Sequence, residues 1–452
     1  MRIPKFLIAA TMMLFAFGNM LYAQTLPFTI GTPVDVGARA AGLGGAMTGV
    51  GGTYSSLYYN PAGLGLIEKP LVTAGFSQLK WTDTATSYGN ETMDESTYTK
   101  LDAMGIALPV PTQRGSLVFS FGYHKQRSYD SRLKSSGMFD VEYEAYDQVF
   151  LLDGLNGEYD EMQNGHLSQT SFGVSVEMAR NIFFGAALNF WNGHREYTWN
   201  LYEEGGVWIF PPIPEDPNEY QFMIPDFERI DHFEERYGGT NVTLGTLVKS
   251  NPYFHFGAVI ETPLTLTAKR DWDFLEREWV YEGWEDEQLP DTSDAGFYDY
   301  KMKAPWKFRI GGALYIGPMM ISGDAELVDY SQMLFQNDPP SVSEGTKAEI
   351  NQDIRDNFRS VWNPRLGMEL TIPRVDARLR GGYAIYKSPW KNSGNGDVRK
   401  ILSFGGGVTL SKQIMLDIAY QTASWDGMTG ELIETEEIKM DRILFSMTYN
   451  MR

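Results

Sequence analysis

The chain has 452 residues, a formal net charge of −20 and no cysteine. The missing thiols exclude a disulfide scaffold, thiolate metal sites and a lipoprotein-type lipid anchor. The strong negative charge argues against nucleic-acid binding, which needs a basic surface. Aromatic residues make up 14% of the chain and glycine occurs 46 times, a composition that indicates many strands and turns.

Residues 1–23 have the pattern of a secretory signal peptide. Arg2 and Lys5 form its charged start, residues 6–17 form an apolar run, and cleavage would leave Gln24 as the first mature residue. A retained anchor helix is the alternative, but the apolar run is shorter than the ~20 residues that span a bilayer. We therefore expect a cell-envelope or secreted protein.

Segment 24–69 comes next and lacks sustained alternation of apolar and polar residues. Its many glycines allow tight turns and close approach to neighbouring walls. The pair Asn60-Pro61 favours a turn, because proline fixes its own φ and keeps the preceding residue out of the helical region. A plain surface loop is the alternative interpretation of this pair.

From residue 70 onward, apolar and polar residues alternate, as a strand with two different faces requires. In "QIMLDIAYQ", for example, Leu416, Ile418 and Tyr420 share one face and Asp417 lies on the other. The pattern predicts about fourteen strands. Their expected ranges are 70–81, 98–109, 115–128, 168–179, 182–203, 238–249, 254–276, 300–316, 319–330, 360–372, 375–390, 398–410, 413–426 and 436–451.

The connections alternate between short and long. The short ones are expected at 109–114, 179–181, 250–253, 317–318, 373–374 and 411–412, and the long ones at 82–97, 129–167, 204–237, 277–299, 331–359, 391–397 and 427–435. Outer-membrane barrels have this asymmetry. We therefore predict an all-β, transmembrane antiparallel barrel over residues 70–452. A lumen of this width is open or plugged, and segment 24–69 is the natural plug. A soluble β-sandwich is the alternative.

If the apolar faces meet lipid, charged residues of both signs face the lumen. These predicted lumen charges are Lys307, Arg309, Asp324, Glu326, Arg365, Glu369, Asp376, Arg378, Arg380, Asp417 and Arg442. A sandwich core would not accept them, because each unpaired buried charge costs several kcal/mol. The solvated outer face of a soluble sheet is the alternative explanation for the same residues.

The stretch "GARAAGLGGAMTGVGGTYSSLYYNPAGLGLIEKP", residues 37–70, resembles the N-terminal signature of the FadL/TodX family of outer-membrane transporters for long-chain fatty acids and other hydrophobic compounds. The matching residues are Gly37, Arg39, Gly44, Gly45, Ala46, Asn60, Pro61, Ala62, Gly63 and Leu64. The resemblance implies a hatch inside the barrel and a sideways exit at a kinked third strand. Here that strand is 115–128, where Gly122 would permit a bend. Bacteroidetes-type relatives with this signature include accessory barrels of protein-secretion machines.

No catalytic or metal-binding motif is present, so we expect neither an enzyme nor a bound metal or cofactor. The expected function is passive uptake of a hydrophobic small molecule, in contact with outer-membrane lipid and lipopolysaccharide. Aromatic residues of the long loops are the candidates for capturing it: Trp208, Phe210, Phe222, Phe227, Trp272, Phe274, Trp279 and Trp284. Their alternative role is an interfacial belt or loop packing. The alternative function is an accessory barrel that binds or shuttles proteins of a secretion or assembly machine.

Overall fold

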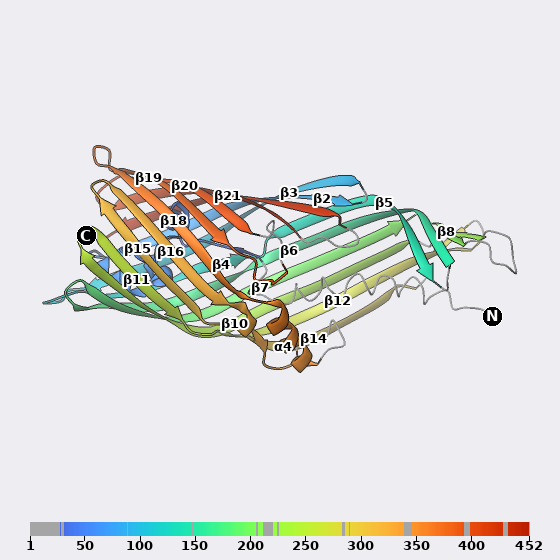
Figure 1. Ribbon diagram of the computed structural model, residues 1–452, viewed down its shortest axis with the longest axis horizontal. Coiled ribbons are helices and arrows are strands. Elements are labelled where there is room, and N and C mark those ends of the chain that lie inside the picture. The colour runs from blue at the N-terminus through green and yellow to red at the C-terminus, as the bar shows by residue number, and fades with distance from the viewer. Residues whose placement is uncertain are drawn as a thin grey trace.

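The computed structural model describes residues 28, 31–87, 89–145, 148–204, 207–210, 220–223, 226–282, 285–288, 290–338, 346–392, 398–427 and 433–451. The expected signal peptide, residues 1–23, and the capture candidate Trp284 lie outside the described residues. The strands tilt around a common axis and enclose a lumen, and the C-terminus lies at the end with the short turns (Figure 1).

Fourteen antiparallel strands close into a barrel, which confirms the predicted fold class. The ring is closed by pairing of the first wall strand with the last, from Leu71 opposite Asn450 to Thr86 opposite Thr435. In chain order the wall strands are β2 (Leu71–Ser87), β3 (Asn90–Val110), β4 (Leu117–Ser128), β6 (Gln148–Ala179), β7 (Ile182–Glu204), β10 (Phe227–Asn251), β11 (Phe254–Glu261), β15 (Lys307–Ile316), β16 (Met319–Asp329), β18 (Ser360–Ile372), β19 (Ala377–Tyr386), β20 (Arg399–Thr409), β21 (Ile414–Asp426) and β22 (Thr435–Asn450).

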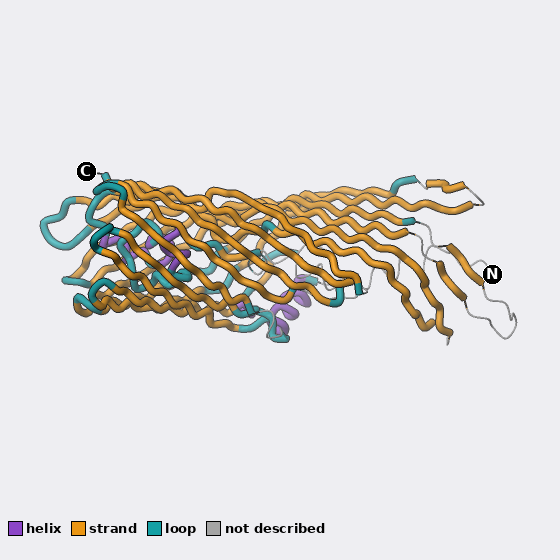
Figure 2. The backbone as a smooth tube through the Cα atoms, turned by 90° about the horizontal axis from the view of Figure 1, so that it is seen from above, coloured by secondary structure: helices purple, strands orange, loops and turns teal. Residues whose placement is uncertain are grey.

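Several strands extend the wall on one side, well past the remaining strands (Figures 1 and 2). Beyond the ends of β4 and β11, β5 (Ser131–Ala145) pairs with β6, and β12 (Thr265–Glu282) pairs with β10. β14 (Thr292–Lys303) pairs with β12 and carries the short β17 (Leu334–Phe335). The other short strands are β8 (Val207–Phe210), β9 (Tyr220–Met223) and β13 (Glu285–Gln288). We call these added strands, together with the parts of β6, β7 and β10 that pair beyond the ends of β4 and β11, the extension.

The structure corrects the prediction of long loops at 82–97, 129–167, 204–237 and 277–299, because much of this chain is strand. The sequence pattern missed these strands because their outer face is polar. On β7, outward Phe184, Leu188 and Phe190 give way to Asn192 and His194 farther along the same strand. The predicted strands 254–276 and 300–316 also each divide into two, at residues 262–264 and 304–306.

A band of apolar side chains surrounds the short-turn half of the barrel. On β18 the outward residues Trp362, Leu366, Met368 and Leu370 are exposed, while the residues between them are buried. Comparable exposed residues occur on β3, β4, β11, β15, β20 and β22, among them Phe121, Phe256, Ile310, Phe404 and Phe445. A transmembrane strand of ~9–11 residues needs such a band.

The long connection between β16 and β18 includes a helix. It contains η2 (Tyr330–Gln332), β17 and α4 (Lys347–Asn357). Thr346 and Glu349 form a reciprocal capping box at the start of the helix, which satisfies backbone N–H groups that the first helical turn leaves free. Ile350 and Ile354 pack with Phe335 on the inner face of the extension. Among the described residues, no helix has the length and apolar character needed to cross a membrane.

Candidate functional site

The N-terminal segment, residues 31–67, lies among inward-facing residues of the wall. It consists of β1 (Thr32–Pro33), α2 (Ala38–Gly42), α3 (Ser56–Tyr59), η1 (Pro61–Leu66) and the turns between them. Its apolar residues form one buried cluster with wall residues from β2, β3, β4, β7, β15 and β16. Gly44 and Gly45 adopt positive φ angles of 61° and 75°, a conformation that glycine accepts without strain.

Asn60, at the start of the Asn-Pro-Ala-Gly-Leu motif, connects three parts of the structure. Its side-chain oxygen accepts a hydrogen bond from the Ala62 nitrogen at 3.1 Å and caps η1. Its side-chain nitrogen donates to the carbonyl of Thr48 at 2.8 Å and to that of Thr246 on β10 at 2.9 Å. The motif residue is therefore both a local cap and a tie between the segment and the wall.

The remaining motif residues pack against glycines of the wall. A Cβ atom at Gly185 would overlap the backbone of Pro61 and Ala62, and one at Gly173 would overlap Leu57. A Cβ atom at Gly49 would lie 2.7 Å from wall residue Gly312, and one at Gly44 or Gly42 would lie 3.2 Å from Gly382 or Gly405. Sequence reasoning counted glycines in the segment and missed those of the wall. Their signal was glycine at inward positions of otherwise alternating strands.

Ion pairs connect the N-terminal segment to wall strands β18, β19 and β21. Arg39 of α2 contacts Glu369 at 2.9 Å, Arg380 contacts the same carboxylate at 2.6 Å, and Arg380 contacts Asp417 at 2.6 Å. The four side chains alternate in sign and balance in charge. All three wall residues were predicted lumen charges, and the structure brings them together beneath Arg39. We call Arg39, Glu369, Arg380 and Asp417 the balanced network.

A second group of charges lies along β11, β15, β16 and β18. Its contacts are longer: Lys307 to Glu261 at 3.2 Å, Arg309 to Glu261 at 3.5 Å, Arg309 to Glu326 at 3.9 Å and Arg365 to Glu326 at 3.3 Å. Arg309 also donates to the Tyr58 carbonyl of the segment at 3.2 Å. Glu261 was missed by the sequence analysis, although it alternates in step with inward Val259 on β11.

Asp324 and Arg442 bind the backbone of the segment directly. Asp324 accepts hydrogen bonds from the nitrogens of Met47 and Thr48, each at 2.9 Å. Arg442, on the last strand, donates to the carbonyl of Pro33 and to the hydroxyl of Thr32, each at 2.8 Å. Asp376, by contrast, lies in the exposed turn after β18 instead of the lumen, and Arg378 next to it is partly exposed.

The third wall strand, β4, pairs with β3 over only part of its length. Its pairing with β3 runs from Leu117 to His124, opposite Val110 to Ala103, and ends there. From there β4 pairs with β1, with Ser128 opposite Thr32, and the Val34 nitrogen donates to the Gln126 carbonyl. We call this break in the wall the β3–β4 gap.

Ion pairs lie beside the gap, and the expected bend is displaced from Gly122. Lys125 contacts Asp102 at 2.8 Å, and Lys100 contacts Asp130 at 2.5 Å. Gly122 itself stays in regular pairing with Gly105 and with Ser171. The ladder between β4 and β6 becomes irregular later, between Lys125 and Arg127. Gly122 instead leaves room for the Tyr54 ring of the segment.

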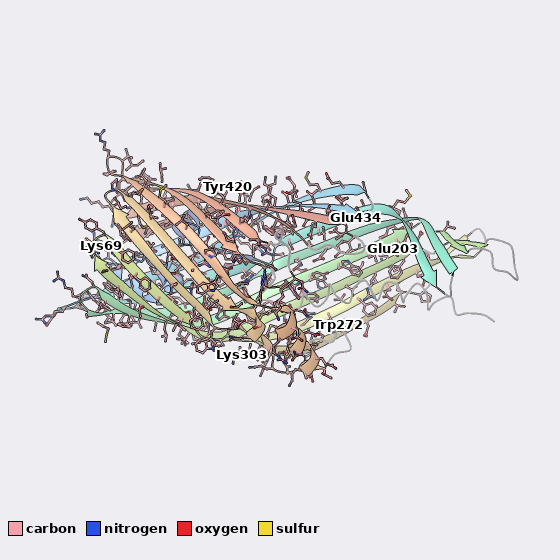
Figure 3. The ribbon with its side chains drawn as sticks, viewed as in Figure 1. Lys69, Glu203, Trp272, Lys303, Tyr420 and Glu434 are labelled. Atoms are coloured by element: carbon pink, nitrogen blue, oxygen red, sulfur yellow. The ribbon has the colours of Figure 1, made fainter. Side chains whose placement is uncertain are left out.

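The capture candidates occupy different parts of the extension. Phe227 and Trp272 pack against a buried aromatic cluster on its inner face, and Trp272 stacks with Phe274 at 6.4 Å between ring centroids. Trp279 contacts Tyr202 on the opposite face. Trp208 and Phe210 belong to β8, and Phe222 to β9. Figure 3 shows Trp272 and Glu203 in the extension, far from Lys69 at the short-turn end.

A buried charge cluster, absent from the sequence predictions, lies below these aromatic rings. Glu235 contacts Arg270 at 2.6 Å and Arg195 at 3.8 Å, and it accepts hydrogen bonds from Tyr237 and Tyr300. The Arg270 guanidinium lies 4.1 Å from the centroid of the Phe233 ring, a cation–π contact. These contacts connect four strands, β7, β10, β12 and β14.

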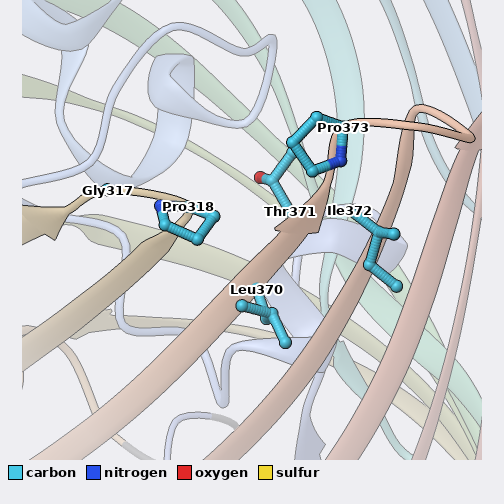
Figure 4. A pocket seen from close by; sticks show the side chains of 6 residues that line it. All are labelled: Gly317, Pro318, Leu370, Thr371, Ile372 and Pro373. Atoms are coloured by element: carbon cyan, nitrogen blue, oxygen red, sulfur yellow. The ribbon is translucent and has the colours of Figure 1, made fainter.

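An open depression of about 610 Å³ lies apart from these features, at two adjacent short turns (Figure 4). Its lining is Gly317, Pro318, Leu370, Thr371, Ile372 and Pro373, which contains no charged side chain. Among the described residues, no group of three or more His, Cys, Asp or Glu side chains is arranged to hold a metal ion. The charged and glycine-lined seat of the N-terminal segment is therefore the candidate site.

These features define a fourteen-stranded transmembrane barrel with its own N-terminal segment among the inward-facing wall residues. No protein-family model and no curated protein matches the chain. Solved structures do match its fold. They include a FadL homologue of Pseudomonas aeruginosa, with a TM-score of 0.60 and 12% identity over 93% of this chain and 100% of that one. They also include the Pseudomonas putida toluene transporter TodX, with a TM-score of 0.57 and 13% identity over 94% of this chain and 100% of that one.

The Ralstonia pickettii toluene transporter TbuX matches with a TM-score of 0.54 and 13% identity, over 92% of this chain and 98% of that one. At such low identities the likeness shows a shared fold, with nearly the whole of each chain aligned. The chain therefore has the fold of FadL/TodX-type barrels, which confirms the fold that the N-terminal signature implied.

Proposed function

We propose that the protein is an outer-membrane channel for passive uptake of hydrophobic small molecules. The fold supports this, because the structures that share it include proteins described as toluene transporters. The observation that carries the proposal is the β3–β4 gap, where a transmembrane wall strand leaves its neighbour and pairs with the N-terminal segment. An apolar solute needs such a sideways exit, since leaving into water would cost it the free energy gained by burial.

Capture takes place on the inner face of the extension. Phe227, Trp272 and Phe274 lie there beside the buried aromatic cluster of Tyr197 and Phe233. Removing apolar surface from water stabilises a complex by ~25 cal/mol per Å², so a solute binds without any covalent step. The N-terminal segment acts as a hatch that directs the solute toward the gap.

Uptake into liposomes tests the proposal. Folded protein should accelerate entry of a labelled long-chain fatty acid or aromatic hydrocarbon relative to protein-free liposomes. No acceleration with either solute would contradict the proposed uptake. Co-purification of a protein partner at fixed stoichiometry, together with that result, would favour an accessory barrel for protein secretion or assembly.

An engineered disulfide tests the exit route. The chain has no native cysteine, so the two introduced thiols can pair only with each other. The pair Thr32→Cys and Ser128→Cys joins opposite residues of β1 and β4, at a separation that a disulfide spans. Oxidation should stop uptake and reduction should restore it. The control pair Ala38→Cys and Ser446→Cys joins the segment to β22, where the Ala38 nitrogen lies 3.3 Å from the Ser446 hydroxyl. Equal uptake by both oxidised pairs would contradict exit through the gap.

A further inference from the structure

Opposite charges follow directly where the backbone ladder between β3 and β4 stops. The last residue pair of that ladder is Ala103 opposite His124. The next residues along the two strands are Asp102 and Lys125, and their carboxylate and ammonium groups lie 2.8 Å apart. At the start of the β3–β4 gap, contact between side chains therefore takes over from contact between backbones.

A second ion pair lies two residues farther along β3. Lys100 contacts Asp130 at 2.5 Å and donates to the side-chain oxygen of Asn164 on β6 at 2.8 Å. Asp130 also accepts hydrogen bonds from the Ser128 hydroxyl at 2.5 Å and from the Gly165 nitrogen at 3.2 Å. We call the pairs Asp102–Lys125 and Lys100–Asp130 the gap pairs.

Three of the four side chains in the gap pairs are shielded from water. Those of Asp102, Lys125 and Asp130 are 1%, 4% and 1% exposed, and that of Lys100 is 25% exposed. A buried ion pair is a weak source of stability, because both ions lose their hydration and apolar residues of similar volume often stabilise a protein as well. Charges at this position therefore need an explanation other than stability.

A backbone ladder and an ion pair differ in how they can open. A ladder opens only when successive hydrogen bonds break, and freed backbone groups in a membrane wall find no water. An ion pair separates when two side chains rotate, while β3 stays paired with β2 and β4 stays paired with β6. β1 already pairs with the part of β4 that β3 leaves, so closure of the gap depends on side chains.

We propose that the gap pairs form a gate: they hold the β3–β4 gap closed, and separation of Asp102 from Lys125 lets a solute pass into the membrane. The inference rests on the proposed uptake function and adds how the exit is controlled. Ser77 is a positioning residue, since its hydroxyl donates to the Asp102 carboxylate at 2.8 Å. Because attraction between charges sets the closed state, removing the charges should speed exit.

Uptake into liposomes by a double alanine variant tests the gate. Asp102→Ala combined with Lys125→Ala removes both charges, so neither is left buried without its partner. The folded variant should take up a labelled long-chain fatty acid at least threefold faster than the unsubstituted protein. Equal rates, both above that of protein-free liposomes, would overturn the gate and leave the proposed uptake standing.

Lys125→Arg separates the effect of charge from that of shape. The substitution keeps a positive charge opposite Asp102, so uptake should proceed at the unsubstituted rate. A gain as large as that of the double alanine variant would mean that the shape of the lysine side chain, and not its charge, closes the gap. That result would overturn the proposal.

Lys80 and Glu95 provide the matched control. They form an ion pair at 2.6 Å between β2 and β3, but their side chains are 46% and 48% exposed and the backbone ladder continues past them. Lys80→Ala combined with Glu95→Ala should leave the rate of uptake unchanged. A gain equal to that of the Asp102 and Lys125 variant would show a general loosening of these strands and would overturn the gate.

Thiol labelling tests the gate without any transport, in a chain that has no cysteine of its own. Ala103→Cys places a thiol beside the gap, and Ala107→Cys places one inside the ladder; both alanines are buried. A lipid-soluble maleimide should label position 103 at least tenfold faster when Asp102 and Lys125 are replaced by alanine, and position 107 at an unchanged rate. Unchanged labelling at position 103 would overturn the gate, whether or not the protein transports a solute.

Discussion

The two sides of the N-terminal segment are held in the barrel by different interactions. On the side of β6, β7 and β10, wall glycines admit the segment backbone, and Asn60 completes the fit with direct hydrogen bonds. On the side of β15 to β19, charged side chains bridge the space and several of their polar atoms lack protein partners. Wall glycines also contact the segment on the second side, where Gly312 meets Gly49 and Gly382 meets Gly44. The two sides therefore share close backbone packing, and the second side adds a network of ion pairs.

Arg380→Ala should have the largest effect on this arrangement. The substitution leaves Glu369 and Asp417 buried without their shared cation. Breaking a buried ion pair in this way costs about 3–5 kcal/mol. Denaturant unfolding followed by tryptophan fluorescence gives the change in the free energy of unfolding.

Arg378→Ala is the matched control for Arg380→Ala. Arg378 lies two residues earlier on the same strand, is partly exposed and contacts Asp376 at 3.9 Å. A surface ion pair of this kind contributes ~0–1 kcal/mol. Equal losses of stability in the two alanine variants would contradict a stabilising role for the balanced network.

Gly185→Ala probes the glycine-packed side and should have an intermediate effect. The added methyl group would overlap Pro61 and Ala62, so the segment or the wall has to move. Overpacking of this kind destabilises a protein by about 1–3 kcal/mol. The variant should also conduct more ions than the unsubstituted barrel, because the contact seal is broken.

Gly381→Ala is the control for this effect, since a Cβ atom at that position meets nothing within 4 Å. Its stability and conductance should equal those of the unsubstituted protein. Unchanged conductance in Gly185→Ala would mean that wall glycines do not form the seal.

Asn60→Ala should have the smallest effect of the three. It removes the cap of η1 and the two hydrogen bonds to Thr48 and Thr246. Loss of such a cap costs ~0.5–2 kcal/mol. Asn90→Ala, which removes an exposed hydrogen bond to Ser136 beside the turn between β2 and β3, is the control. A smaller loss of stability for Asn60→Ala than for Asn90→Ala would contradict the role of Asn60 as a tie to the wall.

The sequence predicted the part of the barrel that meets lipid. There each strand needs apolar residues outside and polar or small residues inside, and the short turns at 317–318 and 411–412 follow directly. The extension was missed because strands outside the bilayer face water on the outside. On β7 this change of outer face occurs between Phe190 and Asn192.

Side-chain pairing was harder to predict than strand position. Alternation placed Arg380 and Glu369 on inward faces, but their contact depends on the register between β18 and β19, which the pattern does not encode. The gap likewise depends on pairing, since β4 keeps its strand conformation while it exchanges β3 for β1 as a partner. Gly122 suggested a bend, yet its lack of a side chain makes room for Tyr54.

The hydrogen bonds from Arg442 to Thr32 and Pro33 connect the last wall strand to the start of the N-terminal segment. These partners are separated by 410 and 409 positions in the chain. The strand that emerges last in synthesis thus completes the binding surface for one of the earliest described residues. Contacts so distant in sequence form slowly. Barrel closure and the last contacts of the N-terminal segment consequently belong to a single late step, and a barrel halted before that step would lack both hydrogen bonds.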